Sequence, residues 1–252
     1  MAWLLIDNSN TRTKLALGDT GGLFDWRAVI PTAELDAAAL DQALGGISFA
    51  GVAVASVVPE KADVLAAYFS GKQPLHFLSH ESPLGYGFDV DHPEQIGNDR
   101  LANAAALREL YGFPAIAVDF GTAVTFSVLS ADGNFMGGAI APGMAAMTNY
   151  LSTRTAQLPA IAPHEPAVAI GRTTEEALQS GIVHGHRGMV RGILREILAE
   201  LGGQSRIIAT GGGAEFAAKK IPGFCHVDPD LTLNGIRIVA ERFFVDLSRA
   251  DA

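Results

Sequence analysis

The sequence has almost no cysteine and no long uninterrupted apolar run. Its single cysteine, Cys225, excludes an internal disulfide framework and a cysteine-rich metal site, which indicates a reducing compartment. No stretch reaches the roughly 18 apolar residues that a membrane span requires, and the opening MAWLLID has no basic segment of an export signal. These absences predict a cytoplasmic protein with no membrane partner.

Basic residues are also scarce. The chain has 18 Lys and Arg against 27 Asp and Glu, a net charge of -9, which argues against nucleic acids and anionic membranes as partners. One basic pocket could still bind an anionic ligand. The seven histidines form no metal-ligand pattern, since even His184 and His186 point to different faces of an expected helix. A small molecule is the expected partner.

The chain does have enough apolar sequence for a large core, at 48% of 252 residues. In its first third, short apolar runs alternate with turn residues, a pattern that predicts strands. A helix is expected at 31–46, with Pro just inside its start and Gly at its end, and a buried parallel strand at 51–58. Three antiparallel strands precede them, at 3–7, 13–18 and 22–30.

One supersecondary unit occurs twice. When Asp7 is placed on Asp119, residues 4–24 overlay residues 116–136 without a gap, and each copy has a strand ending in Asp, a small-residue turn and a second strand. The second copy continues into helices near 142 and 173–201, the strand RIIAT, a Gly-rich turn and a final helix. We therefore expect two α/β domains, residues 1–112 and 113–252, with both Asp-bearing turns facing a cleft between them.

Such turns are suited to phosphate and magnesium. A hairpin turn offers backbone N–H groups to phosphate oxygens, while a carboxylate at a strand end orients a hydrated magnesium ion. In the first copy Asp7 supplies the carboxylate, and Lys14 reaches a phosphate if it shares that face. The alternative is an ordinary polar hairpin turn. The repeat, with a third small-residue turn at 210–213, favours a phosphate site.

Several motifs together resemble those of the type III pantothenate kinases, in the superfamily of acetate and sugar kinases, Hsp70 and actin. DNSNTRTK is similar to that family's DxGNTxxK, and PEQIGNDR carries its GxDR signature; DFGTAVT, GGAIAPGM, TAQLP, GRTTEEALQSG and TGGG follow. The resemblance implies an α/β fold of two tandem ribonuclease H-like domains, a duplicated actin-like ATPase fold with an interdomain ATP cleft. It also implies ATP-dependent phosphorylation of pantothenate, the first step of coenzyme A synthesis, by a homodimer using magnesium and potassium or ammonium.

The resemblance also implies roles for individual residues. Asp99 would be the general base on the substrate hydroxyl, Asp119 would bind the monovalent cation, and Asp7 would hold Mg²⁺ through water. The ATP-binding residues would be Asp7, Asn8, Ser9, Asn10, Thr11, Arg12, Thr13, Lys14, Thr122, Gly211 and Gly212. The substrate-binding residues would be Tyr86, Gly97, Asn98, Asp99, Arg100 and Thr174.

Each assignment has a structural alternative. Asp99 and Thr174 could cap helices, Arg100 could form a surface ion pair, Tyr86 could be a packed loop aromatic, and the glycines could form an ordinary turn. Other functions are also open: kinase of another small hydroxyl compound, polyphosphate phosphatase, or a non-catalytic ATP-binding regulator.

One position departs from the family pattern. Ser9 stands where the family and the second copy have glycine, at Gly121 in this chain. Serine fits there only if its backbone angles are ordinary or strain is tolerated, and its Cβ would crowd an approaching phosphate. Its hydroxyl could instead donate a hydrogen bond to that phosphate.

Overall fold

The computed structural model describes residues 1–250, which form two compact units. Unit 1 contains Met1–Gly112, Gly133–Phe135 and the chain from Asp230 onward, and unit 2 contains Phe113–Asp132 and Met136–Pro229. The division expected from the sequence, 1–112 and 113–252, differs from this one mainly in the C-terminal helix. The fold of each unit accounts for that difference.

Unit 1 is built on a five-stranded sheet with the order β3-β2-β1-β4-β5. The strands β1, β2 and β3 form an antiparallel meander, and β4 and β5 continue the sheet in parallel. The predicted meander and the buried parallel strand are therefore both present. The strand bounds are Trp3–Asn8 (β1), Arg12–Asp19 (β2), Gly22–Pro31 (β3), Val52–Ser56 (β4) and Leu75–Phe77 (β5).

The first helix begins later than the sequence predicts. Pro31 ends β3 instead of starting a helix, and a short 3-10 turn, Thr32–Glu34, follows it. The α-helix starts after Asp36, whose carboxylate accepts a hydrogen bond of 2.8 Å from Ala39 N. An Asp at this position satisfies one of the free N–H groups of the first helical turn, so it marks the true start. The helices of unit 1 are α1 (Ala37–Leu44), α2 (Pro59–Phe69), α3 (Asn98–Ala106) and α7 (Leu231–Ala250), with a 3-10 turn at Pro93–Gln95 and a π-helical turn at Leu107–Tyr111.

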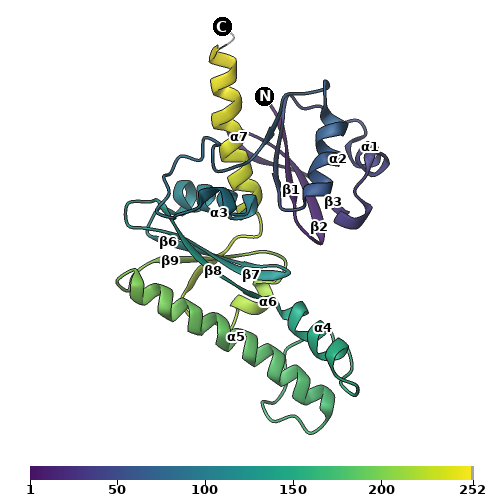
Figure 1. Cartoon of the computed structure of the whole chain (residues 1–252), viewed down its shortest axis with the longest axis vertical. Coiled ribbons are helices and arrows are strands. Elements are labelled where there is room, and N and C mark those ends of the chain that lie inside the picture. The colour runs from purple at the N-terminus through teal and green to yellow at the C-terminus, as the bar shows by residue number, and fades with distance from the viewer. Residues whose placement is uncertain (251–252) are drawn as a thin grey trace. The chain divides into compact units, whose positions relative to one another are not determined.

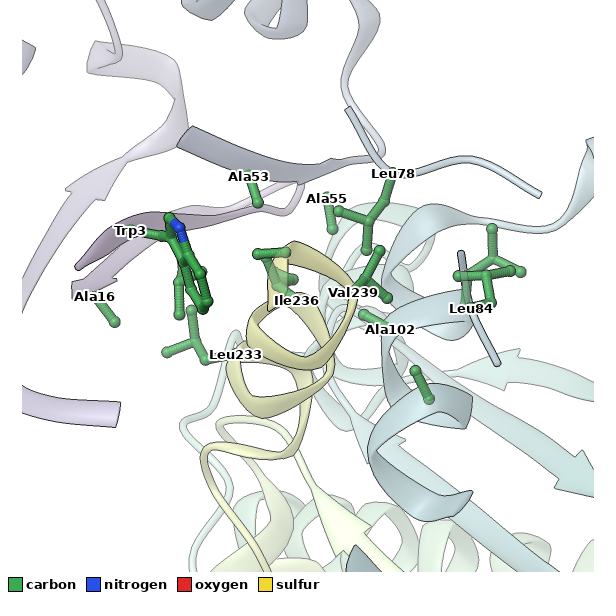
Figure 2. Packing of buried hydrophobic residues seen from close by; sticks show 14 of the residues in the cluster. Trp3, Ala16, Ala53, Ala55, Leu78, Leu84, Ala102, Leu233, Ile236 and Val239 are labelled. Carbon is green, nitrogen blue, oxygen red and sulfur yellow. The ribbon is translucent and has the colours of Figure 1, made fainter. Parts of the chain in front are cut away.

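The core of unit 1 lies on both faces of its sheet. Successive residues of a strand point to opposite faces, so Leu4 and Ile6 pack towards α1 and α2 while Trp3 and Leu5 pack towards α3 and α7. Figure 2 shows the second face, where Leu233, Ile236 and Val239 of α7 lie among the side chains of the sheet and α3. This apolar packing is why α7 belongs to unit 1 and not to the second domain.

Unit 2 repeats the arrangement. Its sheet has the order β10-β9-β6-β7-β8, with β6 and β7 antiparallel and with β9 and β10 continuing in parallel. Helix α5 runs along one face of this sheet (Figure 1), where Val190 and Leu194 pack on the strands. The same strand order in both units confirms the duplication. The element bounds are Ala115–Phe120 (β6), Ala123–Leu129 (β7), Phe135–Pro142 (β8), Met144–Arg154 (α4), Thr174–Glu200 (α5), Arg206–Thr210 (β9), Ala214–Ala218 (α6) and Phe224–Val227 (β10).

The two Asp-bearing turns differ in length by one residue. Asn8 pairs with Thr13, which leaves residues 9–12 in the first turn, while Phe120 pairs with Val124, which leaves only 121–123 in the second. The ungapped overlay is therefore wrong by one residue beyond the turn. The structural counterpart of Lys14 is Thr125, since these residues lie opposite Asp7 and Asp119 respectively.

Among the helices of residues 1–250, none combines the length and the apolar character that crossing a bilayer requires.

Candidate active site

The first turn holds the carboxylate of Asp7 in a fixed environment. Asp7 is only 3% exposed near the end of β1, directly opposite Lys14 on β2. Its Oδ1 accepts a hydrogen bond of 2.8 Å from Ser9 Oγ, and its Oδ2 lies 3.5 Å from Lys14 Nζ. Asp7 and Lys14 therefore lie on the same face of the sheet, which is the condition for Lys14 to reach a phosphate beside Asp7.

A buried polar network lies behind this turn. Asn8 Nδ2 donates to Thr13 Oγ1 at 2.8 Å, and Asn8 Oδ1 accepts from Ser56 Oγ at 2.6 Å. Thr13 Oγ1 lies 3.1 Å from Thr32 Oγ1, which donates to Ser9 O at 2.7 Å. Asn8 and Thr13 are buried, so their side chains shape the turn from behind.

The sequence does not identify two members of this network, Thr32 and Ser56. Their only sequence signal is a small hydroxyl residue at the end of an apolar strand, as Ser56 is in β4, or just after a strand, as Thr32 is after β3. That signal is common at turns and carries no partner information. Their role depends on strand pairing, which a one-dimensional pattern does not specify.

The tip of the turn is exposed and unstrained. Asn10, Thr11 and Arg12 are exposed, and Ser9 N donates to Arg12 O at 3.2 Å to close the turn. Among residues 1–250 only glycines have a positive φ, so the backbone angles of Ser9 are ordinary. A Cβ added at Gly121 would also come no nearer than 3.4 Å to another atom. Neither turn needs glycine for its conformation.

The start of α3 is attached to the first sheet. Asn98 Nδ2 donates to Ser56 O at 3.0 Å, so one residue, Ser56, contacts both Asn8 and the helix. Gly97 occupies the N-cap position without a side-chain cap, and Asp99 Oδ1 accepts from Arg100 N at 2.8 Å. Asp99 lies inside the helix start and not at the N-cap itself. The network therefore connects the Asp7 turn with the helix that carries Asp99.

The environment of Asp99 makes it a stronger proton acceptor. Burial raises the pKa of the Asp99 carboxyl, the hydrogen bond from Arg100 N lowers it, and the negative charge of Asp7 raises it further, with a net upward shift. The negative charge of Asp7 thus disfavours ionisation of Asp99. Burial lowers the pKa of the Arg100 guanidinium, whose Cζ lies 5.4 Å from the centre of the Phe135 ring.

Tyr86 contacts the same helix from a loop. Its hydroxyl donates to Leu101 O at 2.9 Å, and its ring packs against Phe88 and Phe135. Burial raises the pKa of the Tyr86 phenol. These contacts are those of a packed loop aromatic, the alternative noted above, and its contact with substrate stays a prediction.

In unit 2, glycines pack tightly around the second turn. Gly211 has a φ of +89°, and a Cβ on it would fall 2.2 Å from Asp119 Oδ1. Gly143 N donates to Thr122 O at 3.1 Å, and a Cβ there would fall 2.4 Å from the same oxygen. Gly212, by contrast, has open space above its Cα. Gly143, absent from the predicted site residues, therefore helps to hold the turn that carries Thr122.

The residue that caps the start of α5 is Thr173, the neighbour of Thr174. Thr173 Oγ1 accepts from Glu176 N at 3.2 Å, and Glu176 Oε2 accepts from Thr173 N at 3.2 Å, a reciprocal capping box. Thr174 is the exposed first residue of α5. Capping therefore does not explain Thr174.

The donor groups of unit 1 fit a hydrated magnesium ion that arrives with a nucleotide. Among the described residues, no group of three or more His, Cys, Asp or Glu side chains could hold a metal ion. Mg²⁺ typically keeps several waters and uses one or two carboxylates together with substrate phosphates. The Asp7 carboxylate, with Lys14 beside it, is such a donor.

The chain shares its fold with solved structures of distant sequence. The chain superposes on the activator of 2-hydroxyisocaproyl-CoA dehydratase from Clostridium difficile, solved with bound ADPNP, with a TM-score of 0.56 at 12% identity, covering 100% of this chain and 98% of that one. It also superposes on the inorganic polyphosphate/ATP-glucomannokinase from Arthrobacter, with a TM-score of 0.54 at 13% identity, covering 96% and 99%. The fold is thus the duplicated α/β, actin-like ATPase fold of two ribonuclease H-like halves.

Sequence similarity narrows the class to one family. The profile of type III pantothenate kinase matches residues 3–196. A type III pantothenate kinase from Akkermansia muciniphila is 50% identical over 240 residues, covering 95% of this chain and 98% of that protein. The chain belongs to the type III pantothenate kinase family, as its motifs predict.

Proposed function

We propose that the protein transfers the γ-phosphate of ATP to the primary hydroxyl of pantothenate, giving 4'-phosphopantothenate, with Asp99 as the general base. The observation that carries the assignment of the base is the position of Asp99 at the start of α3, where burial and the charge of Asp7 raise the pKa of its carboxyl. A carboxylate with a raised pKa is a better proton acceptor than one in water. The proposal also rests on family membership.

In this mechanism the chain mainly positions groups and neutralises charge. The transition state of phosphoryl transfer is loose, so alignment contributes more than proton removal. The exposed tip of the first turn, Asn10, Thr11 and Arg12, would contact the phosphates, and Lys14 would offset their charge. Magnesium bound with ATP would supply further charge neutralisation, with Asp7 as its water-mediated ligand.

The second turn and the start of α5 have separate proposed roles. Asp119 would bind potassium or ammonium, Thr122 and the Gly211–Gly212 turn would contact the nucleotide, and the partner subunit's Thr174 would contact pantothenate. Thr174 is exposed and does not cap α5, and both observations support that last role. We also propose that the protein forms a homodimer and that it is located in the cytoplasm.

A product assay tests the function. Purified protein is incubated with ATP, magnesium and potassium, and with pantothenate, a panel of hexoses, or no acceptor. We expect phosphopantothenate with pantothenate and little ADP otherwise. Transfer to a hexose would indicate a different small-molecule kinase, acceptor-independent phosphate release a phosphatase, and nucleotide binding without turnover a regulator. Each of these three results would refute the proposal.

A further inference from the structure

We propose that Ser9 is a positioning residue that fixes the orientation of the Asp7 carboxylate for the metal–nucleotide complex. The inference deepens the proposed function and rests on it. Its basis is the hydrogen bond of 2.8 Å from Ser9 Oγ to Asp7 Oδ1, on the opposite oxygen from Lys14. The two residues thus hold the two oxygens of one carboxylate.

Ser9 is the more rigid of the two. Its backbone N–H donates to Arg12 O at 3.2 Å, and its carbonyl accepts from Thr32 Oγ1 at 2.7 Å. The hydroxyl oxygen is only two bonds from the Cα of this fixed backbone. Lys14 instead reaches Asp7 at 3.5 Å along a flexible side chain that is 31% exposed. Ser9 therefore limits rotation of the carboxylate more than Lys14 does.

The hydroxyl has only one proton to donate. While that proton is donated to Asp7, Ser9 Oγ offers only lone pairs to other groups, and a phosphate oxygen needs a donor. This geometry disfavours the direct phosphate contact considered from the sequence. The effect of Ser9 on the nucleotide should then pass through Asp7 and the metal that Asp7 would hold through water.

The second turn provides an internal comparison. Gly121 occupies the position equivalent to Ser9 and has no side-chain donor to offer to Asp119. Magnesium demands near-ideal octahedral geometry, so it benefits from a fixed carboxylate orientation. A serine beside Asp7 and a glycine beside Asp119 are consistent with the proposal that Asp7 holds magnesium and Asp119 a monovalent cation.

Equilibrium binding of a non-hydrolysable ATP analogue tests this role without turnover. Affinity is measured with and without magnesium for wild type, Ser9→Ala, Ser9→Gly and Ser9→Thr. Ser48→Ala, a serine in an exposed loop of the same unit, is the matched control. Circular dichroism melting checks that each variant is folded.

We expect Ser9→Ala and Ser9→Gly to lose about 3- to 10-fold in affinity with magnesium, as for one hydrogen bond to a charged group that is partly replaced by water. Without magnesium their affinity should match wild type. Ser9→Thr keeps the hydroxyl and should stay near wild type, as should Ser48→Ala. In activity assays, the magnesium concentration for half-maximal rate should rise by a similar factor.

Other patterns would overturn the inference. An equal loss with and without magnesium would mean that Ser9 contacts phosphate directly, and a gain in Ser9→Gly would mean that its Cβ obstructs the nucleotide. No change in any variant would mean that Lys14 alone suffices. If wild type binds the magnesium nucleotide but makes no phosphopantothenate, the proposed function fails, while the binding comparison still decides the role of Ser9.

Discussion

Replacing Gly211 by alanine should destabilise the protein far more than the same change at the adjacent Gly212. Gly211 has a φ of +89°, whereas Gly212 lies outside the left-handed region. A Cβ at Gly211 would fall 2.2 Å from Asp119 Oδ1 and 2.8 Å from Phe120 N, and at Gly212 it would meet no atom within 4 Å. The two substitutions therefore add the same methyl group to a crowded position at Gly211 and to an open position at Gly212.

The magnitude follows from these contacts. A left-handed conformation costs a non-glycine residue roughly 1–2 kcal/mol. Overpacking adds about 1–3 kcal/mol, because the Phe120 backbone must shift and not only the Asp119 side chain. Alanine recovers roughly 0.4–1 kcal/mol by restricting the unfolded chain. Gly211→Ala should thus lose about 1–4.6 kcal/mol of unfolding free energy, while Gly212→Ala should be neutral or gain several tenths of a kcal/mol.

Urea unfolding followed by circular dichroism measures both variants against wild type. Nucleotide binding at a low urea concentration, where both variants are folded, gives a second readout, since a methyl group on Gly212 would occupy the open space predicted to receive ATP. Equal unfolding free energies for the two variants would refute the reasoning. So would a larger loss in Gly212→Ala.

Three further predictions concern other parts of the site. Asp99→Asn should reduce turnover much more than nucleotide binding, and it should stabilise the fold at neutral pH. The sign follows from the raised pKa: the stability contribution of Asp99 is present below the unfolded-chain pKa of about 3.9 and is lost as the pH rises through the folded-state pKa. Activity should increase with potassium or ammonium but not with sodium, and Asp119→Asn should remove the difference. Thr173→Ala should cost about 1 kcal/mol through loss of the N-cap, measured by urea unfolding, whereas Thr174→Ala should leave stability unchanged and raise the KM for pantothenate.

Each of these has a clear contrary result. Equal losses of turnover and nucleotide binding in Asp99→Asn would count against a general base. A wild-type rate that is indifferent to the cation would remove the proposed role of Asp119. An equal loss of stability in the two threonine variants would contradict the capping assignment.

The sequence predicts local and periodic features of this fold well. The antiparallel meander, the parallel strand at 52–56 and the long helix α5 all follow from apolar periodicity and turn residues. The duplication is visible because both copies keep a strand that ends near an Asp. Such signals depend on neighbouring residues in one stretch of chain, so they can be recognised without knowledge of the tertiary structure.

Features that depend on pairing were missed or misplaced. The one-residue difference between the two turns appears only from the register of Asp119 with Thr125. Helix α7 has a strong apolar face, but the sequence does not reveal which sheet that face covers. Likewise, the polar network through Ser56 joins positions far apart in the chain. Asn8 and Thr13 are predicted to contact ATP, but the sequence does not reveal that their side chains are buried.

The position of α7 has a consequence for how the protein is made. During synthesis the strands of the first sheet precede unit 2, yet Leu233, Ile236 and Val239, which cover one face of that sheet, are translated only after unit 2 (Figure 2). Until then, Trp3 and Leu5 have no α7 to pack against. A nascent chain stalled before residue 230 would therefore expose an apolar face of this sheet. A chaperone at the ribosome exit would be expected to bind that face.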